Sequence, residues 1–96
     1  MNVVFKSKAE DTLRDIVEFI DDMNVFGAGE RWAVKFVEFI YGYAQLKSIK
    51  KFPLCNNESL ATQGMSCLIY KGWVIAFKIE RANFVIYQII KGDLLY

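Results

Sequence analysis

The sequence predicts a single α+β domain with the element order β-α-α-β-β-β. Two early stretches carry apolar residues at helical spacing, and three later runs rich in β-branched and aromatic residues are separated by short turns. A chain of 96 residues has room for one hydrophobic core. We therefore expect residues 1–96 to form one domain, with a two-helix hairpin packed on one face of a small, mainly antiparallel sheet.

A first helix is expected over about residues 8–23, directly after a short β-rich run at residues 2–6. Ser7 and Glu10 have the spacing of a capping box, which satisfies two backbone N–H groups at a helix start. The apolar positions that recur at helical spacing are Ala9, Leu13, Ile16, Val17, Ile20 and Met23.

A second helix is expected over about residues 30–49, after a connection at 24–29 that contains two glycines. Lys47, Lys50 and Lys51 lie at or beyond its last turn, where cations suit the negative end of the helix dipole. Pro53 then ends the segment. Because the connection is short, the two helices should pack antiparallel.

Residues 56–59 are polar and predict a loop, and three strands follow at about 62–70, 73–80 and 84–90. Their short turns indicate an antiparallel meander, which the N-terminal strand joins. Strict alternation along the third strand places Val85, Tyr87 and Ile89 on the face away from the helices. An open face of this composition is a candidate binding surface, unless the strand is covered on both sides.

Composition favours a protein partner, and the net charge gives no strong argument for a nucleic-acid partner. The chain is 54% hydrophobic, which leaves apolar surface available for a partner, and its net charge is only +1. Residues 1–30 hold three bases and seven acids, whereas residues 31–96 hold nine bases and four acids. The later basic bias is compatible with a phosphate-binding face and with an ordinary solvated surface.

Several chemistries are disfavoured by residue types. The chain has no histidine, which removes Ser-His-Asp and Cys-His catalysis and histidine-ligated metal sites. Cys55 and Cys67 lack metal-ligand spacing, and Cys67 alternates with apolar neighbours as a small core residue does. We expect no metal or cofactor. The chain has no apolar run near the ~20 residues that span a bilayer, so a cytoplasmic protein is expected.

The order of these elements, together with several local features, resembles the RelE/ParE superfamily of type II toxin–antitoxin toxins. The opening Val3-Val4-Phe5 run leads directly into a helix, and Phe52-Pro53 precedes the meander. Gly64 begins the first meander strand, and 73–79 is similar to the aromatic-basic-aliphatic strand of these toxins. The third strand closes on Lys91-Gly92, where members carry a His-Gly or His-Arg pair.

The resemblance implies one of two activities. RelE-type members cut mRNA on the ribosome without a metal, through basic and aromatic side chains, whereas ParE-type members share the fold and act on DNA gyrase. This chain has Met65 after Gly64, where members often carry an arginine, and Lys91 in place of the late histidine. Because a lysine is a poor proton acceptor at neutral pH, these departures favour binding a target over cutting RNA.

The candidate site residues follow from the same comparison. Lys78 and Lys91 are expected to share the non-helix face, with Tyr96 folded near them; these three are the candidate catalytic residues. The candidate binding residues are Lys47, Lys50, Lys51, Val85, Tyr87 and Ile89. The alternative roles are a solvated strand lysine for Lys78, helix capping for the lysine cluster, core packing for Tyr87 and a frayed terminus for Tyr96.

Three functions are compatible with these residues. The chain is expected to be a ParE-like toxin that binds DNA gyrase, a RelE-like endoribonuclease that acts on ribosome-bound mRNA, or a catalytically silent relative that only binds an antitoxin. All three predict that an amphipathic helix or strand of a cognate antitoxin covers exposed apolar surface. The expected assembly is a homodimer or a hetero-oligomer. No membrane association is expected.

Overall fold

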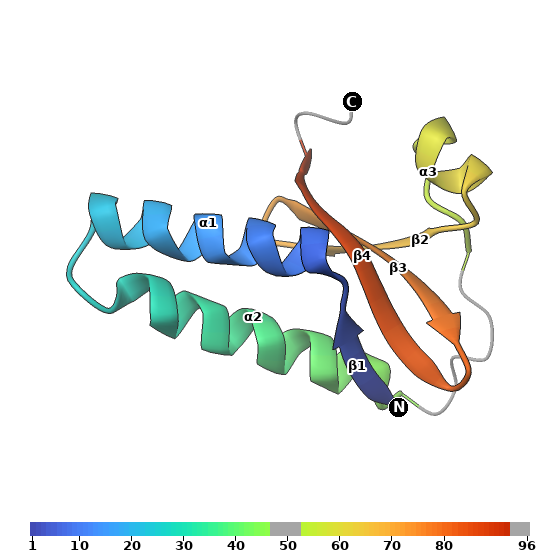
Figure 1. Cartoon of the computed structure of the whole chain (residues 1–96), viewed down its shortest axis with the longest axis horizontal. Coiled ribbons are helices and arrows are strands. Elements are labelled where there is room, and N and C mark those ends of the chain that lie inside the picture. Colours follow the sequence, from blue (N-terminus) through green and yellow to red (C-terminus); the bar gives the residue numbers. More distant parts are fainter. Residues whose placement is uncertain (47–52, 93–96) are drawn as a thin grey trace.

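The computed structural model describes residues 1–46 and 53–92, and Figure 1 shows the order of their helices and strands. The elements are β1 (Asn2–Phe5), α1 (Ser7–Met23), α2 (Ala28–Ala44), α3 (Glu58–Thr62), β2 (Ser66–Tyr70), β3 (Trp73–Glu80) and β4 (Asn83–Lys91). The predicted α+β class, the helical hairpin and the three-stranded meander are therefore confirmed. The helix α3 was not predicted, because a loop was expected at its start.

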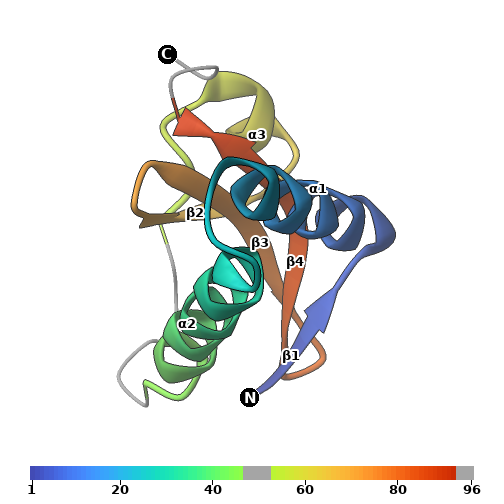
Figure 2. The same ribbon diagram turned by 90° about the vertical axis from the view of Figure 1, so that its left-hand side faces the viewer.

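The sheet has the strand order β1-β4-β3-β2. β1 pairs in parallel with β4, while β2, β3 and β4 form the antiparallel meander. The helices α1 and α2 pack together and lie against one face of this sheet (Figure 2). The expected recruitment of the N-terminal strand into a mainly antiparallel sheet is confirmed.

The main core lies between the helical hairpin and the sheet. Phe77 of β3 and Phe84 of β4 are fully buried, and their rings stack with centroids 4.2 Å apart. Phe36 and Ile40 of α2 are also fully buried in this cluster. Stacked aromatic pairs add stability beyond their buried area, so this group anchors α2 to the two central strands.

The first helix does not use the expected capping box. Lys6 occupies the N-cap position, with extended backbone and no side-chain cap, and Ser7 is already helical. The reason is that the strand runs straight into the helix: the Lys6 N–H still donates to the Ile86 carbonyl oxygen of β4 (2.9 Å). A Ser7 hydroxyl one position further along is therefore not placed to cap the helix.

The segment between α2 and β2 differs most from the sequence prediction. The helix α2 ends at Ala44 rather than near residue 49, and α3 forms where a loop and the start of a strand were expected. The Asn57 side-chain oxygen accepts a hydrogen bond from the Leu60 N–H (3.1 Å), which caps α3. Thr62 therefore belongs to a helix, and β2 begins only at Ser66.

The two cysteines form a disulfide, which was not predicted, and Cys67, expected to be a small core residue, is partly buried against a small core cluster. Cys55 and Cys67 have Cα atoms 4.9 Å apart and a sequence separation of 12. The bond joins the segment before α3 to strand β2. Alternation along β2 places Cys67 and Ile69 on the non-helix face, because their partners on β3 are Ala76 and Val74.

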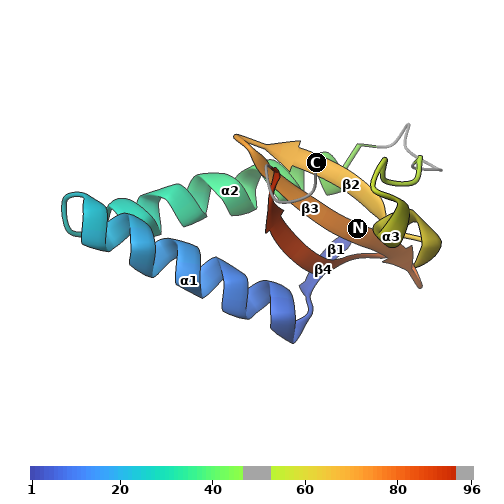
Figure 3. The same cartoon turned by 90° about the horizontal axis from the view of Figure 1, so that it is seen from above.

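The helical hairpin extends beyond the sheet. Figure 3 shows the connection between α1 and α2 at one end of the molecule and α3 at the other. The principal extents of 40 × 28 × 21 Å reflect this projection. Among the residues that the structure describes, no helix has the length and apolar character needed to cross a membrane.

Candidate functional site

A β-bulge in β4 determines which side chains share a face of the sheet. Ala76 of β3 pairs with Gln88, but the next residue, Phe77, pairs with Ile86, so Tyr87 is an extra residue on β4. The bulge reverses the alternation of β4 beyond this point. Tyr87 packs on the non-helix face, whereas Ile89 joins the helix-side core. Bulges frequently redirect side chains at functional sites.

Tyr87 is hydrogen-bonded to a carboxylate on the neighbouring strand. Its hydroxyl donates to both carboxylate oxygens of Glu80, at 2.6 and 2.8 Å. This hydrogen bond, with smaller contributions from desolvation and from the Glu80 charge, raises the pKa of Tyr87 above its ordinary value of 10.0. The phenol is therefore neutral at physiological pH and acts as a hydrogen-bond donor.

Two lysines flank the Tyr87 ring. The Nζ atoms of Lys78 and Lys6 lie 5.2 and 5.5 Å from the ring centroid, within the range of a cation–π interaction. Lys78 comes from β3, and Lys6 follows β1, which pairs with β4. We call Lys6, Lys78, Glu80 and Tyr87 the Tyr87 cluster.

The Tyr87 cluster can hold an anion. Two ammonium groups and one carboxylate give it a net positive charge, and all four side chains are at least partly exposed. Lysine ammonium groups bind phosphate as point charges. An incoming carboxylate or phosphate that took the place of the Glu80 carboxylate would also accept a hydrogen bond from the Tyr87 hydroxyl. As a general base the phenol is poorly suited, because its raised pKa opposes loss of the proton.

Replacing Glu80 with glutamine should lower the pKa of Tyr87 toward 10.0, because the charged acceptor that favours the protonated phenol is lost. In the wild type, the raised folded-state pKa contributes stability below about pH 10 that is lost as pH rises through that pKa. NMR titration of Cζ-labelled tyrosine measures the shift. Glu58→Gln, an exposed acid in α3, is the control, and an unchanged Tyr87 pKa in Glu80→Gln would contradict this assignment.

The predicted catalytic group is not assembled as expected. Lys78 lies on the non-helix face, but Lys91 pairs with Trp73 beyond the bulge and lies at the end of the helix-side surface. The prediction that Lys78 and Lys91 share one face is therefore wrong, because it assumed unbroken alternation along β4. Tyr96 lies outside the described residues.

Lys91 instead lines a cavity of about 600 Å³ beside α1. Its other lining residues are Thr12, Asp15, Ile16, Phe19, Ile20 and Trp73. This lining is mostly apolar and includes one acid and one base, which suits a peptide segment better than a phosphate.

The predicted binding residues are also separated by the structure. Val85 and Ile89 are 5% and 4% exposed, so neither offers contact area to a partner, and Ile89 faces the helices. Tyr87 keeps its predicted place on the non-helix face, and so does Val85, which pairs with Lys78 but is buried there. The lysine cluster of residues 47, 50 and 51 lies outside the described residues. Lys6 and Glu80 belong to the site but were not predicted, because their roles depend on strand pairing.

A second surface of interest lies at the end of the helical hairpin. Four large apolar side chains there are exposed: Phe19 (66%), Met23 (69%), Val25 (75%) and Phe26 (93%). We call these four residues the hairpin tip. Because Phe19 also lines the cavity beside α1, the hairpin tip and that cavity form one continuous apolar surface.

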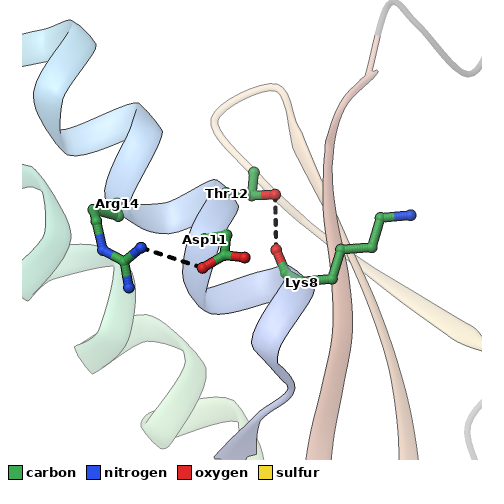
Figure 4. A network of polar contacts seen from close by, with 4 residues as sticks. All are labelled: Lys8, Asp11, Thr12 and Arg14. Carbon is green, nitrogen blue, oxygen red and sulfur yellow. Dashed lines mark hydrogen bonds and ion pairs between the residues drawn. The ribbon is translucent and has the colours of Figure 1, made fainter.

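The surface of α1 beside this apolar area is acidic. Figure 4 shows that Arg14 pairs with Asp11 (3.2 Å) near the start of the helix, where the Thr12 hydroxyl donates to the Lys8 carbonyl oxygen (3.0 Å). The pairing offsets the charge of Arg14, although an exposed pair of this kind adds little stability. Further along α1, every charged side chain is acidic: Asp15, Glu18, Asp21 and Asp22.

In comparisons with known proteins, no family model matches the chain and no curated protein matches it significantly.

Proposed function

We propose that this protein is the toxin of a type II toxin–antitoxin pair. It acts in the cytoplasm as a ParE-like growth inhibitor, binds a target such as DNA gyrase, and is neutralised by a cognate antitoxin. The order and spacing of the helices and of the meander support the proposal, as do the two separate surfaces on opposite parts of the molecule. One surface is polar and cationic, and the other is apolar and acidic.

The proposal that the protein binds its target without chemistry is supported chiefly by the protonated, hydrogen-bonded Tyr87 hydroxyl. Its hydroxyl is engaged by the Glu80 carboxylate, and its raised pKa keeps it protonated. Lys6 and Lys78 supply positive charge beside its ring. The Tyr87 cluster is thus equipped to contact an acidic or phosphate-bearing target rather than to move protons.

The hairpin tip and the adjoining cavity supply the surface for the antitoxin. A contiguous apolar surface of this kind marks a protein-interaction site. The acids on α1 beside it favour a partner segment with apolar residues on one side and basic residues on its flank. An amphipathic helix of the antitoxin that lies along α1 would meet both requirements.

Replacing Phe19 and Phe26 together with serine is expected to weaken antitoxin binding roughly tenfold or more, because exposed aromatic residues commonly carry most of the energy of an interface. Calorimetric titration with the purified product of the adjacent gene measures the loss. Val34→Ser, which removes an exposed apolar side chain of α2 outside the tip, is the matched control. Equal affinity of the Phe19/Phe26 variant and the wild type would refute this placement of the antitoxin.

A second candidate function, a RelE-like endoribonuclease that cleaves ribosome-bound mRNA without a metal, is favoured by one observation. Lys6 and Lys78 place two cations around a phenol that can donate to a phosphate oxygen, which is a suitable arrangement for stabilising charge during RNA cleavage. Expression without the antitoxin followed by mapping of mRNA ends distinguishes the two functions. Cut mRNA supports the nuclease, intact mRNA in arrested cells supports the binding toxin, and unimpaired growth supports a silent relative.

A further inference from the structure

The non-helix face of the sheet is covered in part by the segment that contains α3. Leu60 and Met65 of this segment are each 4% exposed, and with Cys55 they pack on the fully buried Ala76 of β3. Cys67, Tyr87 and Ile90 border this small cluster. The cover therefore adjoins the Tyr87 cluster.

Backbone hydrogen bonds among the described residues help to hold the cover in place. Leu54 forms an isolated bridge with Ser66, and the Cys55 N–H donates to the Met65 carbonyl oxygen (2.9 Å). The five-residue helix α3 has only sparse contacts with the other elements. The Cys55–Cys67 disulfide is the covalent attachment of this segment to the sheet.

We infer that the Cys55–Cys67 disulfide is a redox-controlled latch, and that its reduction releases the α3 cover and exposes the apolar sheet face beside Tyr87. Segments with small buried area and few hydrogen bonds open most readily, and a cross-link between their ends suppresses that opening. The cover also contacts the Tyr87 cluster, because Tyr87 packs against the buried group that Leu60 and Met65 form with Cys55 and Ala76. The latch depends on the disulfide and its surroundings alone, whatever target the protein binds.

The exposure of the two cysteine residues favours one order of reduction. Cys67 is partly exposed, whereas Cys55 is 6% exposed, so a thiolate of a dithiol reductant attacks Sγ of Cys67. The Cys55–Cys67 bond breaks, and Cys55 leaves as a thiolate that takes up a proton. The second thiol of the reductant then attacks the mixed disulfide and releases Cys67. Two electrons pass to the protein, and the reductant becomes a disulfide.

Hydrogen–deuterium exchange of the full chain, oxidised or treated with dithiothreitol, tests the latch. Reduction is expected to speed amide exchange of residues 55–65 about tenfold or more, while α1, α2 and β3 change less than about twofold. Alkylation with iodoacetamide, followed by mass spectrometry, verifies that both thiols have been freed. A smaller change in 55–65, an equal change throughout the helices, or a disulfide that dithiothreitol leaves intact would each overturn the inference.

The Cys55→Ser/Cys67→Ser double variant is the matched control. Without reductant it should exchange like the reduced wild type, and dithiothreitol should not change it further. If this variant does not fold, the reduced and alkylated wild type takes its place, with far-ultraviolet circular dichroism verifying its helices. A folded variant that exchanges like the oxidised wild type would also overturn the latch.

Discussion

Replacing Phe77 with alanine is expected to lower the free energy of unfolding by about 3–5 kcal/mol. Phe77 is fully buried, stacks on Phe84 and makes an edge contact with Tyr43 of α2. Its removal leaves a cavity where α2 meets the two central strands, and rigid strands on both sides limit collapse of the surroundings. Urea denaturation monitored by circular dichroism measures the change.

Phe26→Ala is the control for this loss. The side chain removed is the same, but Phe26 is 93% exposed at the hairpin tip, so its replacement should change stability by less than about 0.5 kcal/mol. If both variants lost similar stability, Phe77 would not be the centre of the core described above.

The Gly29→Ala substitution should be the second strongly destabilising change, with a loss of roughly 3 kcal/mol, at the upper end of the range for overpacking. A Cβ atom at Gly29 would lie 2.2 Å from the Val17 carbonyl oxygen, which is a backbone atom that cannot rotate away. The Gly29 N–H also donates to the Asp21 carboxylate (2.8 Å), so α1 and α2 are joined at this point. Thermal unfolding measures the loss.

Gly42→Ala is a matched control with the opposite expected sign. Gly42 also lies in α2, and a Cβ atom there would meet nothing within 4 Å. Alanine should stabilise the helix at this position by about 0.5–1 kcal/mol, because glycine loses more conformational entropy on folding. Two glycine-to-alanine changes in one helix should thus shift the melting temperature in opposite directions; a similar shift in both would show that the close helix crossing is not as described.

The sequence was sufficient to predict the helices and strands in which apolar positions recur with a regular period. The hydrophobic stripe of α1 and the β-branched run from Trp73 to Glu80 predicted their elements nearly to the residue. Local periodicity suffices there because each helix or strand buries one continuous face. The short helix α3 was missed because five residues are too few for a period, and only Asn57 signalled its start.

The candidate site was harder to predict because it depends on non-local pairing. No local pattern in β4 marks the bulge at Tyr87, yet that extra residue separates Lys78 from Lys91 and buries Ile89 under the helices. Lys6 reaches Tyr87 only because β1 pairs in parallel with β4. The disulfide likewise requires the segment before α3 to return to β2, which the cysteine spacing alone does not reveal.

Inducible expression without the antitoxin, with gyrase–DNA cleavage complexes as the readout, tests the proposed function most directly. The wild type is expected to arrest growth and to accumulate these complexes while mRNA stays intact. The Lys6→Glu/Lys78→Glu variant should lose both effects, whereas Lys8→Glu/Lys35→Glu, which reverses two exposed helix lysines, should retain them. Growth arrest with cut mRNA and no cleavage complexes, or unimpaired growth, would contradict a ParE-like binding toxin.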